Sequence, residues 1–304
     1  MKSFEEYVLD FLKLRKELNF SEATVTNARR SLKYFNNYLR EINILNPSEI
    51  TKKTLADYRS HLFYWRKKNG MPLSVQEQRK RLSHIKIFLS HLTREDIIIF
   101  NPAFDMLMPR QPSTIPEFFL TREEITRVLK TPDLNITRGI RDRTILEIFC
   151  ASGIRRKEMT SLKITDIHFE KEVLFIRQGK GQKDRMVPIS QRALGWIDTY
   201  LNDSRVKLNK KDSTTLFLNR YGDSIHPDFL TKIIRVYLNE ANIKKPGSCH
   251  LFRHTLATIM LENGAQITDI CQMLGHKRIE TTQVYAKVVI SELKKIYKKT
   301  QPLR

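Results

Sequence analysis

Several side chains in the second half of the chain lie in short motifs that could act on a phosphate group. Arg155 stands near an expected helix start, three residues before Glu158. Lys180 lies between two glycines in an expected turn. Taken singly, an arginine–glutamate pair at this spacing is more often an ordinary helix-surface pair, and a turn lysine is more often solvated. Neither motif alone identifies a function.

The segment His250-Leu251-Phe252-Arg253-His254 places two histidines four residues apart. Such a pair on a helix can bind zinc. Leucine stands where the zinc-protease motif has its glutamate, however, and no third ligand is evident. His250 and Arg253 share one helix face, because residues three apart do so. An acid–base group beside a guanidinium suits phosphate chemistry better than a metal.

The last motif is Leu274-Gly275-His276, which Tyr285 follows nine residues after the histidine. A tyrosine hydroxyl has an ordinary pKa of about 10, so it needs a base to become a nucleophile. One tyrosine among the ten of this chain is more often a core or surface residue. Lys180 is not part of a nucleotide-binding loop, because a glycine follows it where that loop has serine or threonine.

Together and in this order, the motifs resemble those of the tyrosine recombinase (phage integrase) family. The resemblance runs from about Leu120 onward, and a helical first part followed by a linker agrees with it. The family pattern is Arg…Lys…His-x-x-Arg…His/Trp…Tyr, with an acidic residue three positions after the first arginine. This sequence meets the pattern at Arg155, Glu158, Lys180, His250, Arg253, His276 and Tyr285.

The resemblance implies site-specific cleavage and rejoining of DNA strands through a 3′-phosphotyrosyl intermediate and a Holliday junction. Tyr285 would be the nucleophile, His250 the general base that takes its proton, and Lys180 the acid that protonates the leaving 5′-oxygen. Because the phosphotyrosine conserves the energy of the broken bond, we expect no ATP. Because arginine and lysine supply the positive charge, we expect no metal and no other cofactor.

The remaining motif residues would stabilise and orient this reaction. Arg155 and Arg253 would hold the equatorial oxygens of the transition state with charge-assisted hydrogen bonds. His276 would bond the phosphate or the tyrosine oxygen. Glu158 would not contact the phosphate itself but would orient the arginine and histidine that do.

Amphipathic spacing predicts four helices in the first part of the chain. We expect them to begin after Ser3 with Glu6 as a capping box, after Ser21, after Thr51 (running to about Lys68) and after Ser74 (running to about Leu92). Arg79, Lys80 and Arg81 on the fourth helix are candidate DNA contacts, although a solvated helix face explains them equally well.

The second part is predicted to be helical with one hairpin. Thr121 and Glu124 form another capping box, and helices are expected over 122–130 and 137–151. The segments 172–176 and 185–189 read as strands on either side of a glycine-containing turn. Helices resume after Ser190, and residues 290–297 suggest an amphipathic helix beyond Tyr285.

These patterns indicate a mainly α protein of two domains. We expect a helical core-binding (SAM-like) DNA-binding domain over residues 1–108 and a linker with several prolines over 109–118. A tyrosine-recombinase catalytic domain with a small antiparallel β-sheet and a C-terminal interaction helix would cover 119–304.

Charge is the strongest compositional signal. Lys and Arg number 54 against 33 Asp and Glu, a formal net charge of +21. Residues 1–110 hold 20 basic and 12 acidic residues, so both parts carry an excess of positive charge. Two basic lobes favour a polyanion partner such as DNA or RNA over a surface kept basic for solubility.

Composition also excludes several classes. Three widely spaced cysteines rule out a disulfide scaffold and a cysteine-rich zinc site, and they favour a reducing compartment. No apolar run is long enough to span a bilayer, and acidic residues stand where a signal peptide needs an apolar stretch. We therefore expect a soluble cytoplasmic protein with no membrane partner.

The resemblance further implies the partners: double-stranded DNA with inverted-repeat core sites, and a homotetramer on two sites joined through the C-terminal helix. The chain begins directly with the helical lobe, so we expect a simple Xer-like subtype without an arm-binding domain. Integration, excision, inversion and dimer resolution stay open, as does a need for an accessory protein or second recombinase. The alternatives are a type IB topoisomerase-like enzyme and a non-catalytic DNA-binding regulator.

Overall fold

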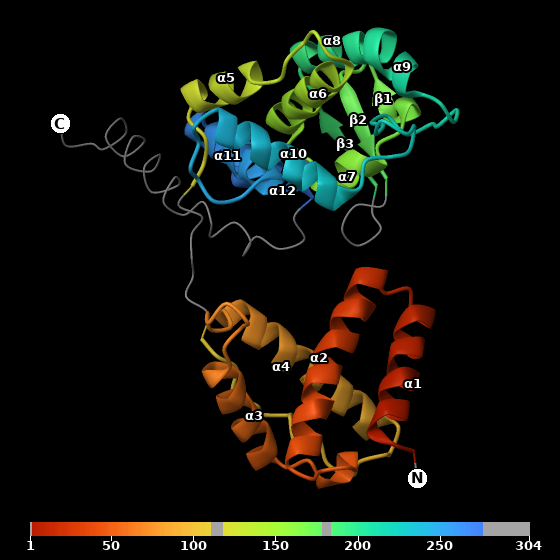
Figure 1. Ribbon diagram of the computed structural model, residues 1–304, viewed down its shortest axis with the longest axis vertical. Coiled ribbons are helices and arrows are strands. Elements are labelled where there is room, and N and C mark those ends of the chain that lie inside the picture. Colours follow the sequence, from red (N-terminus) through yellow and green to blue (C-terminus); the bar gives the residue numbers. More distant parts are fainter. Residues whose placement is uncertain (1, 111–117, 178–183, 276–304) are drawn as a thin grey trace, which may run out of the picture. The chain divides into compact units, whose positions relative to one another are not determined.

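The structure is a computed structural model that describes residues 2–110, 118–177 and 184–275. The chain divides into two compact units, residues 1–113 and 114–304 (Figure 1). Each unit has a hydrophobic core of its own.

Over residues 2–110, unit 1 consists of four α-helices and one short 3₁₀ turn. Capping boxes at Ser3, Thr51 and Ser74 and a serine cap at Ser21 open the four helices, so the predicted starts are confirmed. Phe4, Phe11, Phe35 and Phe88 pack edge to face in the core. The helices are α1 (Phe4–Glu17), α2 (Glu22–Glu41), α3 (Lys52–Tyr64) and α4 (Val75–Arg94), with the 3₁₀ turn at Pro47–Glu49.

Helix α3 ends four residues earlier than the sequence predicts. The prediction carried it to about Lys68, but the backbone turns extended at Trp65. Arg66 Nη1 donates hydrogen bonds to the carbonyls of Phe63, Tyr64 and Trp65, which satisfies the helix end with a side chain. The indole of Trp65 meanwhile packs against the Tyr34 ring. The Arg66 bonds are local, but the contact of Trp65 with Tyr34 of α2 depends on tertiary placement, so residue spacing did not reveal the end.

Unit 2 is mainly helical and contains one small sheet. Its capping box at Thr121 and Glu124 and its helix Arg122–Lys130 agree with the prediction. The helices are α5 (Arg122–Lys130), α6 (Thr137–Ser152), α7 (Arg156–Ser161), α8 (Gln191–Thr199), α9 (Val206–Leu208), α10 (Pro227–Glu240), α11 (Cys249–Glu262) and α12 (Ile267–Leu274), with a 3₁₀ turn at Ile164–Asp166 and a π-helical stretch at Tyr200–Arg205.

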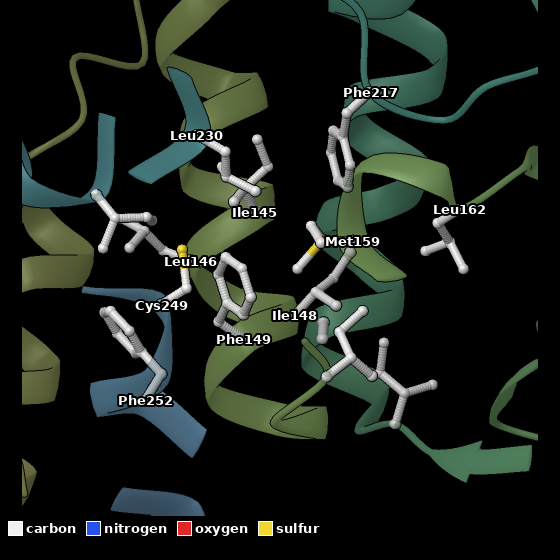
Figure 2. Close-up of a cluster of buried hydrophobic side chains, with 14 of the residues drawn as sticks. Ile145, Leu146, Ile148, Phe149, Met159, Leu162, Phe217, Leu230, Cys249 and Phe252 are labelled. Atoms are coloured by element: carbon white, nitrogen blue, oxygen red, sulfur yellow. The ribbon is translucent and has the colours of Figure 1, made fainter. Parts of the chain in front are cut away.

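Helix α6 is the central element of unit 2. Its side chains are buried on nearly every face, including the charged residues Arg141, Asp142 and Glu147. Figure 2 shows Ile145, Leu146, Ile148 and Phe149 of this helix surrounded by side chains from α7, α10 and α11. A helix that is buried all round anchors a core. The elements that carry the site residues are therefore packed around a common support.

The sheet of unit 2 has three antiparallel strands, β1 (Ile167–His168), β2 (Val173–Ile176) and β3 (Arg185–Pro188). The two predicted strands pair in the register Ile176 with Arg185. Strand β1 was not predicted, because two residues are too few to show an alternating pattern. The predicted fold class, mainly α with a small antiparallel sheet, is confirmed. Among the described residues, no helix is long and apolar enough to cross a membrane.

Candidate active site

Arg155 is held at the junction between α6 and α7. Helix α6 ends at Gly153 with φ of 58°, a left-handed conformation that favours glycine. A side chain at 153 would also approach Leu274 Cδ2 to 3.0 Å and Leu256 Cδ2 to 3.1 Å. Arg155 follows as the N-cap residue of α7, and its backbone N–H donates to Glu158 Oε2 at 2.8 Å. The tight turn thus fixes the position of the Arg155 backbone, from which the guanidinium extends.

Glu158 lies between two arginines. Arg155 Nη1 donates to Glu158 Oε1 at 2.8 Å. Arg185, the first residue of β3, donates through Nη1 to Oε1 at 2.9 Å and through Nη2 to Oε2 at 2.8 Å. The Glu158 side chain is only 6% exposed. Sequence spacing indicated the Arg155–Glu158 pair, whereas Arg185 was not among the predicted site residues.

This arrangement keeps Glu158 ionised. Burial alone would raise its pKa, but the hydrogen bonds and charges of Arg185 and Arg155 outweigh burial and lower the pKa to about 2. A charged carboxylate holds both guanidiniums in charge-assisted bonds. Glu158 is therefore a fixed anchor for Arg155 at neutral pH.

Arg253 reaches the same place from α11. Its guanidinium is buried, with Nη1 donating to the carbonyl of Gly153 at 2.9 Å and Nη2 to that of Leu274 at 2.5 Å. Helix α11 packs against α6, so Arg253 projects toward the α6–α7 turn. The structure thus brings Arg155 and Arg253, 98 positions apart in sequence, to one location.

The end of α12 is the meeting point of three guanidiniums, which we call the arginine cluster: Arg155, Arg185 and Arg253. Arg185 Nε donates to the carbonyl of Met273, Arg253 to that of Leu274, and Arg155 Nη2 to that of Gly275 at 2.6 Å. The last carbonyls of a helix have no partner within it and carry partial negative charge. Three consecutive carbonyls therefore gather three positive charges immediately before His276.

His250 lies three residues before Arg253 on α11 and remains open to solvent on one side. The protein packed around its other side, together with the positive charges of Arg253, Arg156 and Arg155, lowers its pKa below the ordinary value. The ring is thus neutral at pH 7 and able to accept a proton. His254 also has a lowered pKa, chiefly through burial.

Three predicted site residues lie outside the described residues: Lys180, His276 and Tyr285. The predicted C-terminal helix lies outside them as well. The strands before and after Lys180 are described, as is the segment that ends at Gly275. Over residues 2–110, 118–177 and 184–275, no three His, Cys, Asp or Glu side chains come together as a metal site.

The candidate DNA contacts on α4 differ in their surroundings. Arg79 donates to the carbonyl of Pro109 at 2.5 Å. The Arg81 guanidinium lies between the rings of Tyr34 and Trp65, 4.3 Å from each centroid. Lys80 alone is exposed. Arg79 and Arg81 are thus engaged within unit 1, which the sequence pattern did not indicate.

Comparison with protein families identifies both units. Residues 118–291 match the family described as the phage integrase family. Residues 3–106 match the phage integrase SAM-like domain. Together the two matches account for most of the chain.

Individual relatives extend over nearly the whole length. Tyrosine recombinase XerC 2 of Ralstonia nicotianae is 37% identical over 285 residues, covering 94% of this chain and 82% of that protein. Tyrosine recombinase XerD of Staphylococcus haemolyticus is 33% identical over 303 residues, covering 99% of both. The solved XerH recombinase in a post-cleavage complex with its palindromic difH substrate has a TM-score of 0.74 at 21% identity, covering 91% of this chain and 80% of that one. This last likeness shows the fold.

Proposed function

The chain belongs to the phage integrase family and is a tyrosine-type site-specific recombinase, and we propose that Arg155 and Arg253 of its arginine cluster bind the scissile DNA phosphate beside the nucleophile Tyr285. The convergence of Arg155 and Arg253 at the end of α12 carries this proposal. Gly275, whose carbonyl accepts from Arg155, lies one residue before His276 and ten before Tyr285 in the chain.

The proposed reaction is a pair of transesterifications. Tyr285 Oη attacks the phosphorus, the bond to the 5′-oxygen breaks, and a 3′-phosphotyrosyl bond forms. His250 takes the tyrosine proton, and Lys180 gives a proton to the departing 5′-oxygen. The free 5′-hydroxyl of a partner duplex then attacks the phosphotyrosine, which rejoins the strands and releases the tyrosine. Two rounds of strand exchange pass through a Holliday junction. The phosphotyrosyl bond conserves the energy of each broken phosphodiester bond until the strands are rejoined.

The arginines would stabilise the transition state. An attacked phosphodiester gathers negative charge on its equatorial oxygens, and preorganised donors there lower the barrier. Arg155 is held by Glu158 and by the carbonyl of Gly275, and Arg253 by the carbonyls of Gly153 and Leu274. Both therefore need little reorganisation when the phosphate arrives. Their positive charge supplies what a divalent cation supplies in other phosphoryl-transfer enzymes, so the scheme uses no metal, ATP or other cofactor.

His250 suits the role of base because its pKa is lowered. A neutral imidazole accepts a proton at pH 7, whereas an imidazolium does not. The surrounding arginines that lower the pKa also favour release of the proton in the reverse step. His276 would bond the phosphate or the tyrosine oxygen.

For the partners, we propose double-stranded DNA with inverted-repeat core sites, bound by both basic units. Unit 1 would be the core-type DNA-binding domain (residues 1–108), residues 109–118 the linker and 119–304 the catalytic domain. Of the three α4 candidates, Lys80 is the best placed for a phosphate contact, since it is the exposed one. Exchange between two duplexes would need four protomers, joined through the C-terminal segment, in the cytoplasm where the DNA is.

A covalent-trapping experiment tests the function. Nicked duplexes tiled across the DNA that flanks the gene are incubated with the protein without metal or ATP, then run on a denaturing gel. We expect a protein–DNA adduct with the unaltered chain and none with Tyr285→Phe. Tyr221→Phe is the matched control, because Tyr221 is an exposed tyrosine of unit 2 and should leave the adduct intact.

Three results would contradict the proposal. An adduct formed by Tyr285→Phe would assign the nucleophile elsewhere. Bound DNA without an adduct on any tile would favour the DNA-binding regulator. Relaxation of supercoiled DNA that lacks any inverted repeat would favour the topoisomerase-like alternative.

A further inference from the structure

We propose that Arg185 is a positioning residue for strand cleavage, which holds Arg155 and the end of α12 in place through Glu158 and the carbonyl of Met273. This inference rests on the proposed function, because it assigns a role within the same reaction.

Arg185 is nearly enclosed and its contacts are directional. Three of its nitrogens donate hydrogen bonds: Nη1 and Nη2 to the two oxygens of Glu158, and Nε to the carbonyl of Met273 at 3.1 Å. Its side chain is 13% exposed. A planar guanidinium bound in this bidentate way has one orientation. Arg185 therefore donates from all three guanidinium nitrogens to protein groups, and we place its effect on a bound phosphate in these neighbours rather than in direct contact.

These contacts join three segments that lie far apart in sequence. Strand β3, which begins at Arg185, follows in the chain the segment that includes Lys180. Glu158 belongs to α7 and pairs with Arg155, while Met273 is in the last turn of α12. Helix α12 packs against β3 (Figure 1). One side chain thus links the elements next to the proposed acid, the proposed phosphate clamp and the segment leading to Tyr285.

Glu158 passes the effect of Arg185 to Arg155. Oε1 of Glu158 accepts from Nη1 of both arginines, while Oε2 accepts from Arg185 and from the Arg155 backbone. Without Arg185, the Glu158 carboxylate would lose the two hydrogen bonds from Nη1 and Nη2 of Arg185 that fix the orientation of its plane. It could then rotate, and Arg155 would lose a defined partner.

The end of α12 depends on Arg185 in a second way. Gly275 has φ of 67°, and a Cβ built there would lie 3.1 Å from Arg185 Nε and 3.2 Å from its Cδ and Cζ. The backbone at 275 thus rests directly on the Arg185 side chain. The same residue's carbonyl accepts from Arg155. Movement of Arg185 would therefore shift both Arg155 and the backbone that leads to His276.

The test compares Arg185→Gln with Arg143→Gln. Arg143 is also buried, pairs with a buried glutamate (Glu147) and donates to a backbone carbonyl (Leu129), but it contacts no member of the arginine cluster. Single-turnover adduct formation on nicked duplexes at saturating protein gives the rate of the chemical step. Fluorescence anisotropy gives the Kd for the same duplex.

We expect Arg185→Gln to slow adduct formation about 10–100-fold, the usual effect of removing a group that orients a catalytic one. The Kd should change by less than about 2-fold, because Arg185 does not reach the DNA. Arg143→Gln should lower the urea midpoint but leave the rate of the folded protein within about 2-fold. In a double-mutant cycle, Glu158→Gln should remove most of the effect of Arg185→Gln, since the two act as one unit.

A second measurement separates this proposal from the proposed function. In DNA-free protein, the Nε–H NMR signal of Arg155, assigned with Arg155→Lys, should broaden or shift in Arg185→Gln and stay in place in Arg143→Gln. An unchanged Arg155 signal would overturn the positioning role, as would equal rate losses in both variants or additive effects in the cycle. If the signal moves while the unaltered chain forms no adduct, the proposed function fails and the positioning contact stands.

Discussion

Among the residues that the structure describes in unit 2, two buried glutamates each bind two arginines. Glu158 is held by Arg155 and Arg185, whereas Oε1 of Glu147 accepts from Arg143 and Arg192 at 2.7–3.1 Å. The side chains of Glu158 and Glu147 are 6% and 5% exposed. The two glutamates are therefore alike in burial and in the number of arginines that they bind.

They differ in what else their arginines bind. Arg143 caps the end of α5 at Leu129, stacks on Trp196 of α8 and so fastens α5, α6 and α8 together. Arg155 and Arg185 instead bind the carbonyls of Gly275 and Met273, at the last turn before His276. The same ion pair therefore serves structure in one cluster and preorganisation in the other. Which of these two roles a cluster has depends on what the remaining guanidinium N–H groups bind, and not on the ion pair itself.

The largest expected difference between the clusters is in catalysis. Arg155→Gln should slow adduct formation about 10²–10³-fold, because it removes one preorganised donor from the developing charge. The corresponding change at the Glu147 cluster, Arg192→Gln, should leave the rate within about 2-fold. Single-turnover trapping on nicked duplexes measures both. Equal losses in the two variants would mean that the clusters do not differ as described.

A somewhat smaller effect concerns stability and pH. The folded-state pKa of Glu158 is about 2 against an ordinary 4.5. The unfolded chain therefore binds the proton first, so the stabilisation is complete above pH 4.5 and is lost as pH falls toward 2. The shift corresponds to about 3 kcal/mol of unfolding free energy at neutral pH.

Urea unfolding between pH 6 and pH 3 checks this prediction in the unaltered chain and in Glu158→Gln. The variant lacks the titrating group, so its stability should fall less steeply over that interval. Parallel curves would show that Glu158 is not held ionised by its arginines.

The smallest effect is expected at the solvent side of the Glu147 cluster. The Arg192 side chain is 61% exposed, and ion pairs with an exposed partner contribute about 0–1 kcal/mol. Arg192→Gln should thus lower the unfolding free energy by no more than about 1 kcal/mol in urea titrations. A loss of several kcal/mol would place Arg192 on a par with buried Arg143.

Much of the local structure could be predicted from residue types. Capping boxes at Ser3, Ser74 and Thr121 marked helix starts correctly, because a cap is satisfied within four residues of its own helix. The end of α3 and the two-residue strand β1 could not be predicted in this way. Arg66 and Trp65 end α3 through contacts with the helix end and with Tyr34, and β1 exists only because β2 lies beside it.

The sequence by itself determined the family, the mainly α fold class and the order of the motif residues, since each depends on residue identity and spacing along the chain. Only the tertiary structure decided that Arg155, Arg185 and Arg253 bind three consecutive carbonyls at the end of α12. The tertiary structure also distinguishes Arg185, which binds the end of α12, from Arg143, which binds the end of α5. Local sequence patterns do not distinguish these two arginines. The physical reason is that helix-end carbonyls and buried carboxylates select arginines by position in space. Those positions follow from how α7, α11 and β3 pack around α6 and how α12 packs against α11 and β3.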